Sequence, residues 1–499
     1  MRYMAAAVQF EPRFGEKEHN IGRLVELTTE AAQAGARLVV LPEMATTGYC
    51  FLNRREIAPM VEQVPDGPTV RTFAALAARL GIHVVVGLPE LEPSTGAYYN
   101  TAALIGPHGY IGEYRKTHSY IDETRWARDG DLGIPVFETD LGRIAIQICM
   151  DGDYFEPSRV AALAGADVIA FPTNWLGRTL SWRARAVENG VYLIAADRWG
   201  QERGSKFAGD SVILNPRGEA LNLLSTGDGL VLAEIDLDQA RTARAAALAL
   251  RRPDQYQELL LSSYLWAADD AQTLPAGRPA VVAVGPACDG AHMADLARWA
   301  DKQVRDRGWA KLDLAVFPYA AAAPDGAGLL AVALDLDCHL VWAARDPDGC
   351  NTAYLLGPEG LVGRYRQVHA EDGAVPGDEG FPVFDLPWGR IGLLVGQDLA
   401  VPESARILAK LGADLILVPG MTGGDRDRWL WSVRAMENNT ALAVANAEGI
   451  SVTVGPGKVA GGDPGAMTVT LVDTAAPAIR TKELLRKLQP RWYDALVSR

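Results

Sequence analysis

At 499 residues the chain is too long for one ordinary hydrophobic core, so we expect two domains of about 250 residues each. The net charge of −14 argues against nucleic-acid binding, because a phosphate backbone would be repelled. Five cysteines without a CxxC pair or a Cys/His metal spacing fit a reducing compartment. With no signal-peptide pattern and no apolar run near the length of a membrane span, the sequence predicts a cytoplasmic protein without membrane contact.

Short β-rich runs alternate with longer helical segments over the first 235 residues. The strand-like runs are Ala5–Phe10, Leu38–Leu41, His83–Leu88, Thr101–Ile105, Arg143–Cys149, Val168–Phe171, Tyr192–Ala196 and Ser211–Leu214. The helical segments between them include Asn20–Ala34, Thr69–Leu80 and Pro157–Ala164. This alternation is typical of an α/β domain. The turn Gly106–Gly109 between two strand-like runs predicts a hairpin, and therefore a mixed sheet.

An internal repeat indicates that this domain is duplicated. The segment ALIGPHGYIGEYRKTH, which begins at Ala103, returns as YLLGPEGLVGRYRQVH from Tyr354. IPVFETDLGRIAI, GADVIAFP and RAVEN return as FPVFDLPWGRIGL, GADLILVP and RAMEN, and all four offsets lie between 247 and 251 residues. We therefore expect tandem α/β domains at residues 1–268 and 280–499, joined within Asp269–Pro279, which has linker composition.

Reactive side chains follow several of the predicted strands. LVVLPE ends in Glu43, RIAIQIC ends in Cys149, and VIAFPTNW ends in Asn174 and Trp175, while Lys116 ends the return strand of the hairpin. In α/β sheets, ligands bind outside the carboxyl ends of the strands. We therefore expect these side chains to meet in one crevice, with Asn174 and Trp175 lining a substrate pocket.

Four motifs of the first half stand in the order of a known family. They are LPE with Glu43, YRKTH with Lys116, DETRW with Glu123, and CMDGDYFEPSR with Cys149. From Met1 to about Asp236 the chain resembles the nitrilase superfamily, or carbon–nitrogen hydrolases. The resemblance implies a four-layer αββα sandwich in which Glu43, Lys116 and Cys149 are catalytic. It assigns to Glu123 the positioning of Lys116 and of the substrate.

The chemistry of amide hydrolysis suits these residue types. An amide carbon is a poor electrophile, so hydrolysis can be divided through a thioester on a nucleophilic Cys149. We expect Lys116 and the start of the following helix, which contains Glu156, to favour the thiolate. Glu43 would act as general base, while Lys116 and a backbone N–H near Met150 would hold the oxyanion. Neither a metal nor an organic cofactor is expected.

Each of these residues also has a plainer explanation. A single cysteine at a strand end is usually a small buried hydrophobe, and Glu43 and Lys116 could be ordinary surface charges. Glu123 could pair with a neighbouring arginine, and Trp175 could be a packed aromatic. The combination favours a catalytic site, because the plain explanations would all have to coincide in motif order.

The second half lacks the reactive residues. By the repeat, Tyr319, Gln367 and Gly396 stand in place of the glutamate, the lysine and the cysteine. We therefore predict a catalytically inactive domain. Members of the family pair two sandwiches face to face, so the resemblance implies an intramolecular pseudo-dimer, with further homo-oligomers possible. Alternatively, the second half binds a regulator or another protein.

The residues after the cysteine bear on the substrate. Nitrilases that act on nitriles typically show Cys-Trp-Glu, whereas this chain has Cys149, Met150 and Asp151, which favours amides or carbamoyl compounds. Carbamoylases for N-carbamoyl amino acids usually place an arginine shortly after the cysteine, where this chain has Asp153. The main hypothesis is an amidase acting on a small or medium aliphatic amide and releasing ammonia or an amine. The alternatives are an N-carbamoyl amidohydrolase, then a nitrilase, and, in a different class, a non-catalytic binding or scaffold protein.

The charges near the expected pocket leave the substrate's charge open. We expect Met150 and Asp153 to contact the substrate. If Asp153 reaches the pocket, it favours a neutral or amine-bearing substrate, but it could instead cap the following helix. Arg198, Arg203 and Lys206 could approach the pocket mouth, which keeps acidic substrates possible.

Overall fold

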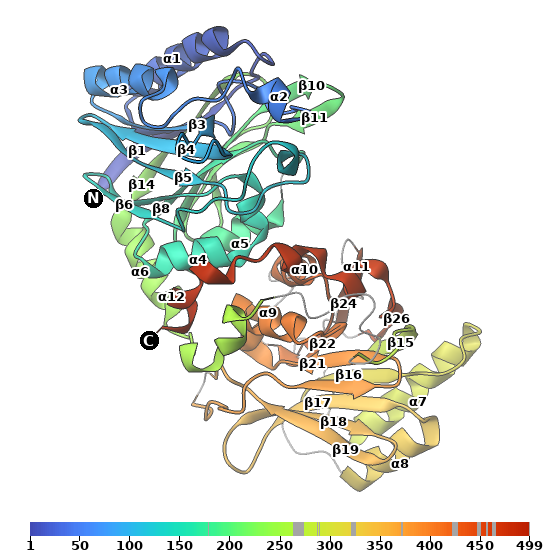
Figure 1. Ribbon diagram of the computed structural model, residues 1–499. Coiled ribbons are helices and arrows are strands. Elements are labelled where there is room, and N and C mark those ends of the chain that lie inside the picture. The colour runs from blue at the N-terminus through green and yellow to red at the C-terminus, as the bar shows by residue number, and fades with distance from the viewer. Residues whose placement is uncertain are drawn as a thin grey trace. The chain divides into compact units, whose positions relative to one another are not determined.

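The computed structural model describes residues 1–177, 179–262, 274–286, 288, 290–320, 326–370, 373–421, 428–446, 451–455, 458–461 and 466–498. The chain forms two compact units, Met1–Ala249 and Leu250–Arg499 (Figure 1). Residues 263–268 of the expected first domain and 269–273 of the expected linker lie outside the described residues. Each unit is a sandwich of its own.

The first sheet of unit 1 is mixed. Its strand order is β14-β1-β2-β3-β4-β5, with β1, β2 and β3 parallel and the other pairs antiparallel. The strands are β1 (Arg2–Gln9), β2 (Ala36–Val40), β3 (His83–Leu91), β4 (Tyr98–Gly106), β5 (Gly109–Arg115) and β14 (Gly229–Asp236). The predicted hairpin is confirmed, because Gly106 pairs with Gly109 where β4 turns into β5.

The second sheet of unit 1 has the order β13-β12-β9-β8-β7-β6, with β7, β8 and β9 parallel. Its strands are β6 (Val136–Thr139), β7 (Gly142–Ile146), β8 (Val168–Thr173), β9 (Tyr192–Asp197), β12 (Ser211–Leu214) and β13 (Ala220–Leu224). A separate hairpin of β10 (Trp199–Glu202) and β11 (Ser205–Ala208) leaves the sheet between β9 and β12. Both sheets thus contain parallel strands, and the reactive residues were expected at the carboxyl ends of such strands.

Helices cover the outer face of each sheet. The helices α1 (Lys17–Gln33) and α3 (Pro68–Leu80) pack on the first sheet, and α4 (Phe155–Leu163) and α5 (Leu180–Asn189) pack on the second. The remaining helices are α2 (Arg54–Ile57) and α6 (Leu237–Leu248). No helix among the described parts of the chain is long and apolar enough to cross a membrane.

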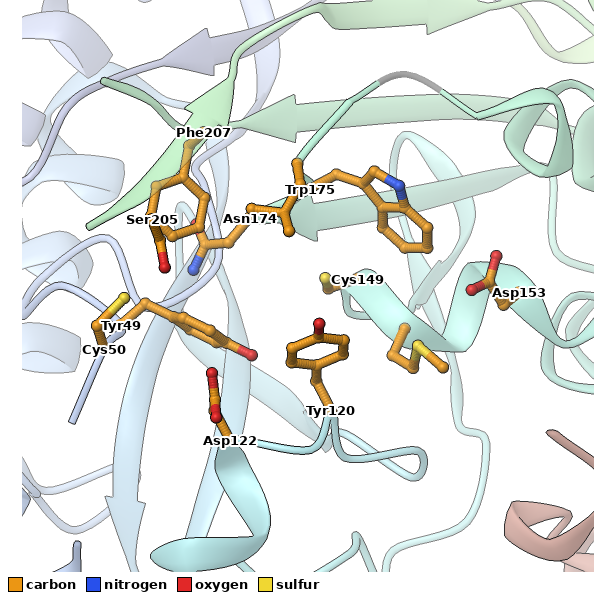
Figure 2. Close-up of a pocket in the computed structure, with 12 residues that line it drawn as sticks. Tyr49, Cys50, Tyr120, Asp122, Cys149, Asp153, Asn174, Trp175, Ser205 and Phe207 are labelled. Carbon is orange, nitrogen blue, oxygen red and sulfur yellow. The ribbon is translucent and has the colours of Figure 1, made fainter. Parts of the chain in front are cut away.

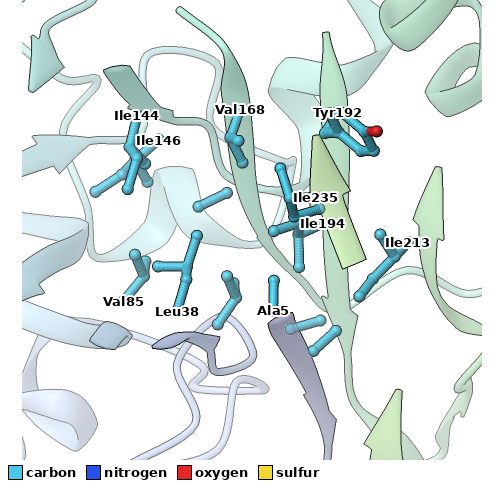
Figure 3. Packing of buried hydrophobic residues seen from close by; sticks show 14 of the residues in the cluster. Ala5, Leu38, Val85, Ile144, Ile146, Val168, Tyr192, Ile194, Ile213 and Ile235 are labelled. Atoms are coloured by element: carbon cyan, nitrogen blue, oxygen red, sulfur yellow. The ribbon is translucent and has the colours of Figure 1, made fainter. Parts of the chain in front are cut away.

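Strand β1 shows why the strands are apolar on both faces. Ala5 and Ala7 belong to the core between the two sheets, whereas Ala6 and Val8 belong to the core under α1 and α3. A strand buried on both faces needs a continuous apolar run rather than an alternating one. Figure 3 shows the inter-sheet core, in which side chains from both sheets meet.

The second unit repeats the same architecture. Its sheets have the orders β19-β18-β17-β16-β15-β26 and β20-β21-β22-β23-β24-β25. The strands of the first are β15 (Pro279–Val284), β16 (Leu314–Tyr319), β17 (His339–Arg345), β18 (Asn351–Gly357), β19 (Gly360–Arg366) and β26 (Thr468–Asp473). Those of the second are β20 (Val383–Leu386), β21 (Gly389–Leu393), β22 (Leu415–Met421), β23 (Ala441–Asn446), β24 (Ser451–Gly455) and β25 (Lys458–Gly461).

The helices of the second unit occupy the corresponding places. They are α7 (Gly290–Asp306), α8 (Gly326–Leu336), α9 (Pro402–Lys410), α10 (Arg428–Asn438), α11 (Pro477–Thr481) and α12 (Asp494–Val497). Side chains of α7 and α8 share a core with the first sheet of this unit. On the second sheet, α10 contacts β23 and β24, and Leu408 of α9 lies against Gly392 of β21. The expectation of two tandem αββα sandwiches is therefore confirmed. Their pairing as a pseudo-dimer stays a prediction.

Candidate active site

A buried ion cluster joins three of the expected site residues. Glu43 follows β2, Lys116 follows β5, and Glu123 begins a short 3-10 helix, η1 (Glu123–Arg125). The Lys116 ammonium lies 2.8 Å from Glu43 Oε1 and 2.6 Å from Glu123 Oε1. All three side chains are at most 1% exposed, so their mutual attraction is not screened by water. The structure thus brings together residues that are up to 80 positions apart in the sequence.

Two neutral side chains also donate hydrogen bonds to this cluster. The Asn100 amide donates to Oε1 of Glu43 at 2.7 Å and to Oε1 of Glu123 at 3.2 Å, and the Tyr49 hydroxyl donates to Oε1 of Glu123 at 2.7 Å. Among the described residues, Oε2 of Glu43 is buried and has no hydrogen-bond partner. One carboxylate oxygen is therefore held in place, and the other can receive a proton. Neither Asn100 nor Tyr49 was expected from the sequence.

Cys149 follows β7 and begins the 3-10 turn η2 (Cys149–Asp153). Its φ of 45° lies in the left-handed region, which residues other than glycine, asparagine and aspartate rarely adopt. The position that corresponds to it in the second unit is Gly396, with a φ of 53°. The sandwich therefore requires a left-handed residue at this turn, and a cysteine there carries backbone strain.

Asp151 ties the turn of the cysteine to the strand end that carries the lysine. Its carboxylate accepts the backbone N–H of Ile148 at 2.9 Å and the backbone N–H of His118 at 3.1 Å. It also accepts the hydroxyls of Tyr114 at 2.8 Å and Thr117 at 3.0 Å. This fully buried carboxylate fixes the geometry of both segments, and the sequence analysis did not identify this role.

A close backbone approach supports the turn that carries Glu43. A Cβ built on Gly87 of β3 would lie 2.5 Å from the Pro42 carbonyl oxygen and 2.8 Å from the Met44 nitrogen. Only glycine can occupy this position without shifting the turn. In the second unit, where the glutamate is replaced, the corresponding residue is Ala343.

A cavity of about 260 Å³ opens above the cysteine (Figure 2). Its lining comprises Tyr49, Cys50, Tyr120, Asp122, Cys149, Met150, Asp153, Asn174, Trp175, Leu176, Ser205 and Phe207. Figure 2 shows the Cys149 thiol between Trp175 and Tyr120. All four residues expected to contact substrate thus lie on the wall. The contributions of the Tyr49 and Tyr120 loops were not expected from the sequence, nor were those of Ser205 and Phe207 on β11.

The charged residues of the described wall are acidic. They are Asp122 and Asp153, which lie on opposite sides of the cavity in Figure 2. Asp122 also pairs with Arg125 at 3.2 Å, and Asp153 accepts the Ser181 hydroxyl at 3.4 Å. Tyr154 occupies the N-cap position of α4, and Asp153 directly precedes it, so the alternative that Asp153 caps this helix stays a prediction.

The three basic residues considered for the mouth do not line this cavity. Arg198 is fully buried and pairs with Glu202 at 2.7 Å. Arg203 pairs with Glu56. Lys206 is exposed on β11 between two lining residues, so the alternation of the strand directs it away from the cavity. The described wall therefore offers no cation to an acidic substrate.

The protonation of Cys149 depends on burial as well as on the neighbouring charges. Burial raises the pKa of the Cys149 thiol well above its usual value, and the negative charge of Glu43 raises it further. Lys116 and a backbone hydrogen bond from Asn174 lower this pKa, but they do not outweigh burial. Moreover, the helix that contains Glu156 begins only at Phe155, and the turn η2 lies between it and the cysteine. Lys116 thus favours the thiolate, as expected, but burial outweighs its effect, so the thiol needs a base at the moment of attack.

Glu43 has the protonation behaviour that such a base requires. Burial raises the pKa of Glu43 to about 7, against a lowering by Lys116, and the charge of Glu123 raises it as well. Burial alone would lower the pKa of Lys116, but the charges of Glu123 and Glu43 hold it well above its usual value. Lys116 therefore stays an ammonium, while Glu43 can exchange a proton near neutral pH. Within the described ranges, no group of three or more His, Cys, Asp or Glu side chains is placed to hold a metal ion.

Comparisons with known proteins identify the family. The model of the family "Carbon-nitrogen hydrolase" matches residues 4–245 and 330–474, so the chain belongs to this family and both halves contribute to the match. A nitrilase of Pyrococcus abyssi is 40% identical over 243 residues, which are 48% of this chain and 92% of the relative. An N-carbamoylputrescine amidase of Oryza sativa subsp. japonica is 32% identical over 284 residues, covering 51% of this chain and 93% of the relative.

Two further matches show the same extent. A 2-oxoglutaramate amidase of Bacillus subtilis is 31% identical over 253 residues, covering 49% of this chain and 95% of the relative. A crystal structure of a carbon–nitrogen hydrolase from Helicobacter pylori is 27% identical with a TM-score of 0.48, covering 52% of this chain and 98% of that chain. Each of these proteins therefore matches about half of this chain.

The strain at position 149 can be measured by substitution. We expect Cys149→Gly to have a free energy of unfolding about 1 kcal/mol above that of Cys149→Ala, because alanine keeps the left-handed penalty and glycine does not. Cys338 is a matched control: it is buried and is not among the residues with positive φ, so alanine should exceed glycine there. Denaturant unfolding of the four variants measures both differences. A more stable alanine at position 149 would contradict the strained turn.

Proposed function

We propose that the first unit hydrolyses a non-peptide carbon–nitrogen bond of a small amide through a thioester on Cys149, releasing ammonia or an amine. One observation carries the proposal: the Cys149 thiol lines the cavity, and the charges of Glu43 and Lys116, which belong to the buried carboxylate–ammonium–carboxylate cluster, act on that thiol. The family match supports the reaction class, since its members are carbon–nitrogen hydrolases.

The first step forms the thioester. The uncoordinated Oε2 of Glu43 accepts the thiol proton while Sγ of Cys149 attacks the carbonyl carbon. Negative charge then develops on the carbonyl oxygen, where the Lys116 ammonium and the backbone N–H of Met150 stabilise it. When the tetrahedral intermediate collapses, Glu43 returns the proton to the leaving nitrogen, and the carbon–nitrogen bond breaks.

The second step releases the acid. Water enters the position of the departed amine, and Glu43 accepts a proton from it as the oxygen attacks the thioester carbon. Collapse breaks the carbon–sulfur bond, and the proton returns to the thiol. Glu123 holds Lys116 throughout, which keeps the ammonium at the oxyanion while Glu43 changes its protonation state.

The wall of the cavity favours neutral or amine-bearing substrates over carboxylates. Tyr49, Tyr120, Trp175 and Phe207 provide apolar and aromatic surface, and the acidic groups would attract an ammonium. One relative is named for N-carbamoylputrescine, whose name denotes an amine-bearing carbamoyl compound. An N-carbamoyl amidohydrolase, which would release carbon dioxide along with ammonia, is therefore the second candidate. A nitrilase ranks third, because Met150 and Asp151 depart from the Trp-Glu pair typical of nitrile-cleaving members.

We propose that the second unit is catalytically inactive. In place of the ion cluster it has a neutral chain: Asn351 donates to Gln367 Oε1 at 2.8 Å, and Gln367 Nε2 donates to the Val395 carbonyl at 2.9 Å. Tyr319 donates to Asn351 at 3.4 Å, and Gly396 has no side chain. Nucleophile, base and cation are thus replaced together. A role as built-in structural partner of the first unit is the preferred interpretation, and binding of a regulator is the alternative.

Trapping the intermediate tests the reaction and its substrate class together. We expect intact-mass spectrometry after acid quench to show an acyl adduct on Cys149 from small amides, or a carbamoyl adduct if carbamoyl compounds are the substrates. In a panel matched for length, amides with methyl or ammonium ends should react faster than those with carboxylate ends. Cys149→Ala should form no adduct and release no ammonia. Turnover by that variant would remove the proposed nucleophile.

The pH dependence follows from the Glu43 carboxyl group. Its pKa is raised to about 7, and the reaction needs the carboxylate, so activity is lost as the pH falls through this value. We expect kcat/KM to fall about tenfold per pH unit below 7 and to level off above it. Initial rates between pH 5 and 9 measure the profile. A plateau that extends down to pH 5 would contradict the role of Glu43.

A matched pair of substitutions distinguishes the two units. Lys116→Met keeps the side-chain volume but removes the oxyanion cation, so we expect kcat to fall by about 10²–10³-fold. Gln367→Met at the corresponding position should leave kcat and KM within about twofold, because that site performs no chemistry. Steady-state ammonia release measures both variants. An equal loss in the two variants would show that the second site takes part.

A further inference from the structure

A buried carboxylate outside the ion cluster holds one wall of the cavity. Glu202, at the end of β10, is 6% exposed. Its Oε1 accepts the backbone N–H groups of Tyr49 at 2.8 Å and Cys50 at 2.5 Å. Its Oε2 pairs with the Arg198 guanidinium at 2.7 Å. The hairpin that bears Glu202 is thereby fixed to the loop that bears Tyr49.

The setting of this contact leaves little room for movement. Arg198 is fully buried and lies 4.1 Å from the centre of the Phe207 ring, which lines the cavity. Gly48 has a φ of 84°, and a Cβ there would lie 2.6 Å from Glu202 Oε2. A charge pair buried in this way keeps its geometry, because breaking it leaves an uncompensated buried charge. The backbone of Tyr49 is therefore anchored from the hairpin side.

The anchored residue reaches the ion cluster directly. The Tyr49 hydroxyl is 2.7 Å from Glu123 Oε1, the same oxygen that accepts from Lys116 and Asn100. A donor to this oxygen disperses part of its negative charge. Lys116 is then drawn less strongly toward Glu123 and remains shared with Glu43.

We propose that Glu202 is a positioning residue that acts through the Tyr49 hydroxyl on Glu123, and so sets how Lys116 is shared between Glu123 and Glu43. This inference rests on the proposed function, in which Lys116 and Glu43 act on the substrate. It assigns to the β10–β11 hairpin a part in the proton chemistry, besides that of forming a wall.

The proposal predicts the direction of a pH effect. When Tyr49 no longer donates to Glu123, the ammonium of Lys116 is bound more tightly by Glu123 and stabilises the Glu43 carboxylate less. The Glu43 proton is then lost only at higher pH, because Lys116 is what opposes the effect of burial on this carboxyl. The acidic limb of the activity profile should therefore move upward.

The test uses two variants and their combination in the full chain. Tyr49→Phe removes only the hydroxyl, and Glu202→Asp shortens the carboxylate by one methylene but keeps the charge opposite Arg198, which preserves folding. Glu56→Gln is the matched control. Glu56 joins the same hairpin to the same loop, through Arg203 and the Leu52 N–H, but at the protein surface.

Two readouts are measured across pH. One is steady-state amide hydrolysis, with rates normalised to the titrated Cys149 thiol. The other is the rate at which iodoacetamide alkylates Cys149, assigned by peptide mass spectrometry, which reports removal of the thiol proton and needs no turnover. If the wild-type chain alkylates with an acidic limb near pH 7 but hydrolyses no amide, the proposed function fails while the positioning role is still measured.

We expect each single variant to lower kcat about tenfold, to leave KM within about twofold, and to move both acidic limbs upward by about half to one pH unit. The double variant should match Tyr49→Phe within about twofold, because Glu202 acts through the hydroxyl that is already absent. Glu56→Gln should behave as wild type. Unmoved limbs, or losses that multiply to about a hundredfold in the double variant, would overturn the proposal.

Discussion

The structure of the first unit's site depends on one buried ammonium between two carboxylates. Lys116 is almost fully removed from water, and so are Glu43 and Glu123. With both carboxylates ionised the cluster has an excess negative charge in a medium that penalises charge, and with Glu43 protonated it is neutral. This balance places the pKa of Glu43 at about 7, and it also explains why a neighbouring lysine does not suffice to ionise the buried thiol.

The scaffold around the cluster does not need its charges. In the second unit Asp398 accepts the N–H groups of Val395 and His369 and the hydroxyl of Tyr365, as Asp151 does in the first. The buried aspartate with its hydrogen bonds and the left-handed turn at Gly396 are thus preserved in the second unit, where the reactive groups are absent. Hydrogen bonds and packing fix the positions of the strand ends, and the ionisable residues are placed on these ends.

The contrast between the scaffold and the ionisable residues placed on it determines what the sequence could predict. Strand runs, the repeat and the residues at strand ends have local patterns, and the αββα sandwiches match them. Tyr49, Asn100 and Glu202 have no such pattern, because each acts through a contact with a residue far away in the sequence. The high pKa of Cys149 could not be predicted from the sequence, because a pairwise charge argument omits the cost of burial. The partners of Arg198 and Arg203, which are Glu202 and Glu56, likewise have no local pattern in the sequence.

The two units also show which constraints accompany the chemistry. Where the first unit has Glu43 it needs Gly87 behind the turn, and where it has Cys149 a non-glycine residue adopts a left-handed conformation. In the second unit the glutamate is gone and the glycine has become Ala343, while the strained cysteine has become Gly396. A glycine in a strand and a side chain at positive φ both destabilise a fold. The reactive side chains of the first unit are thus placed at a cost in local stability that the second sandwich, which lacks them, avoids.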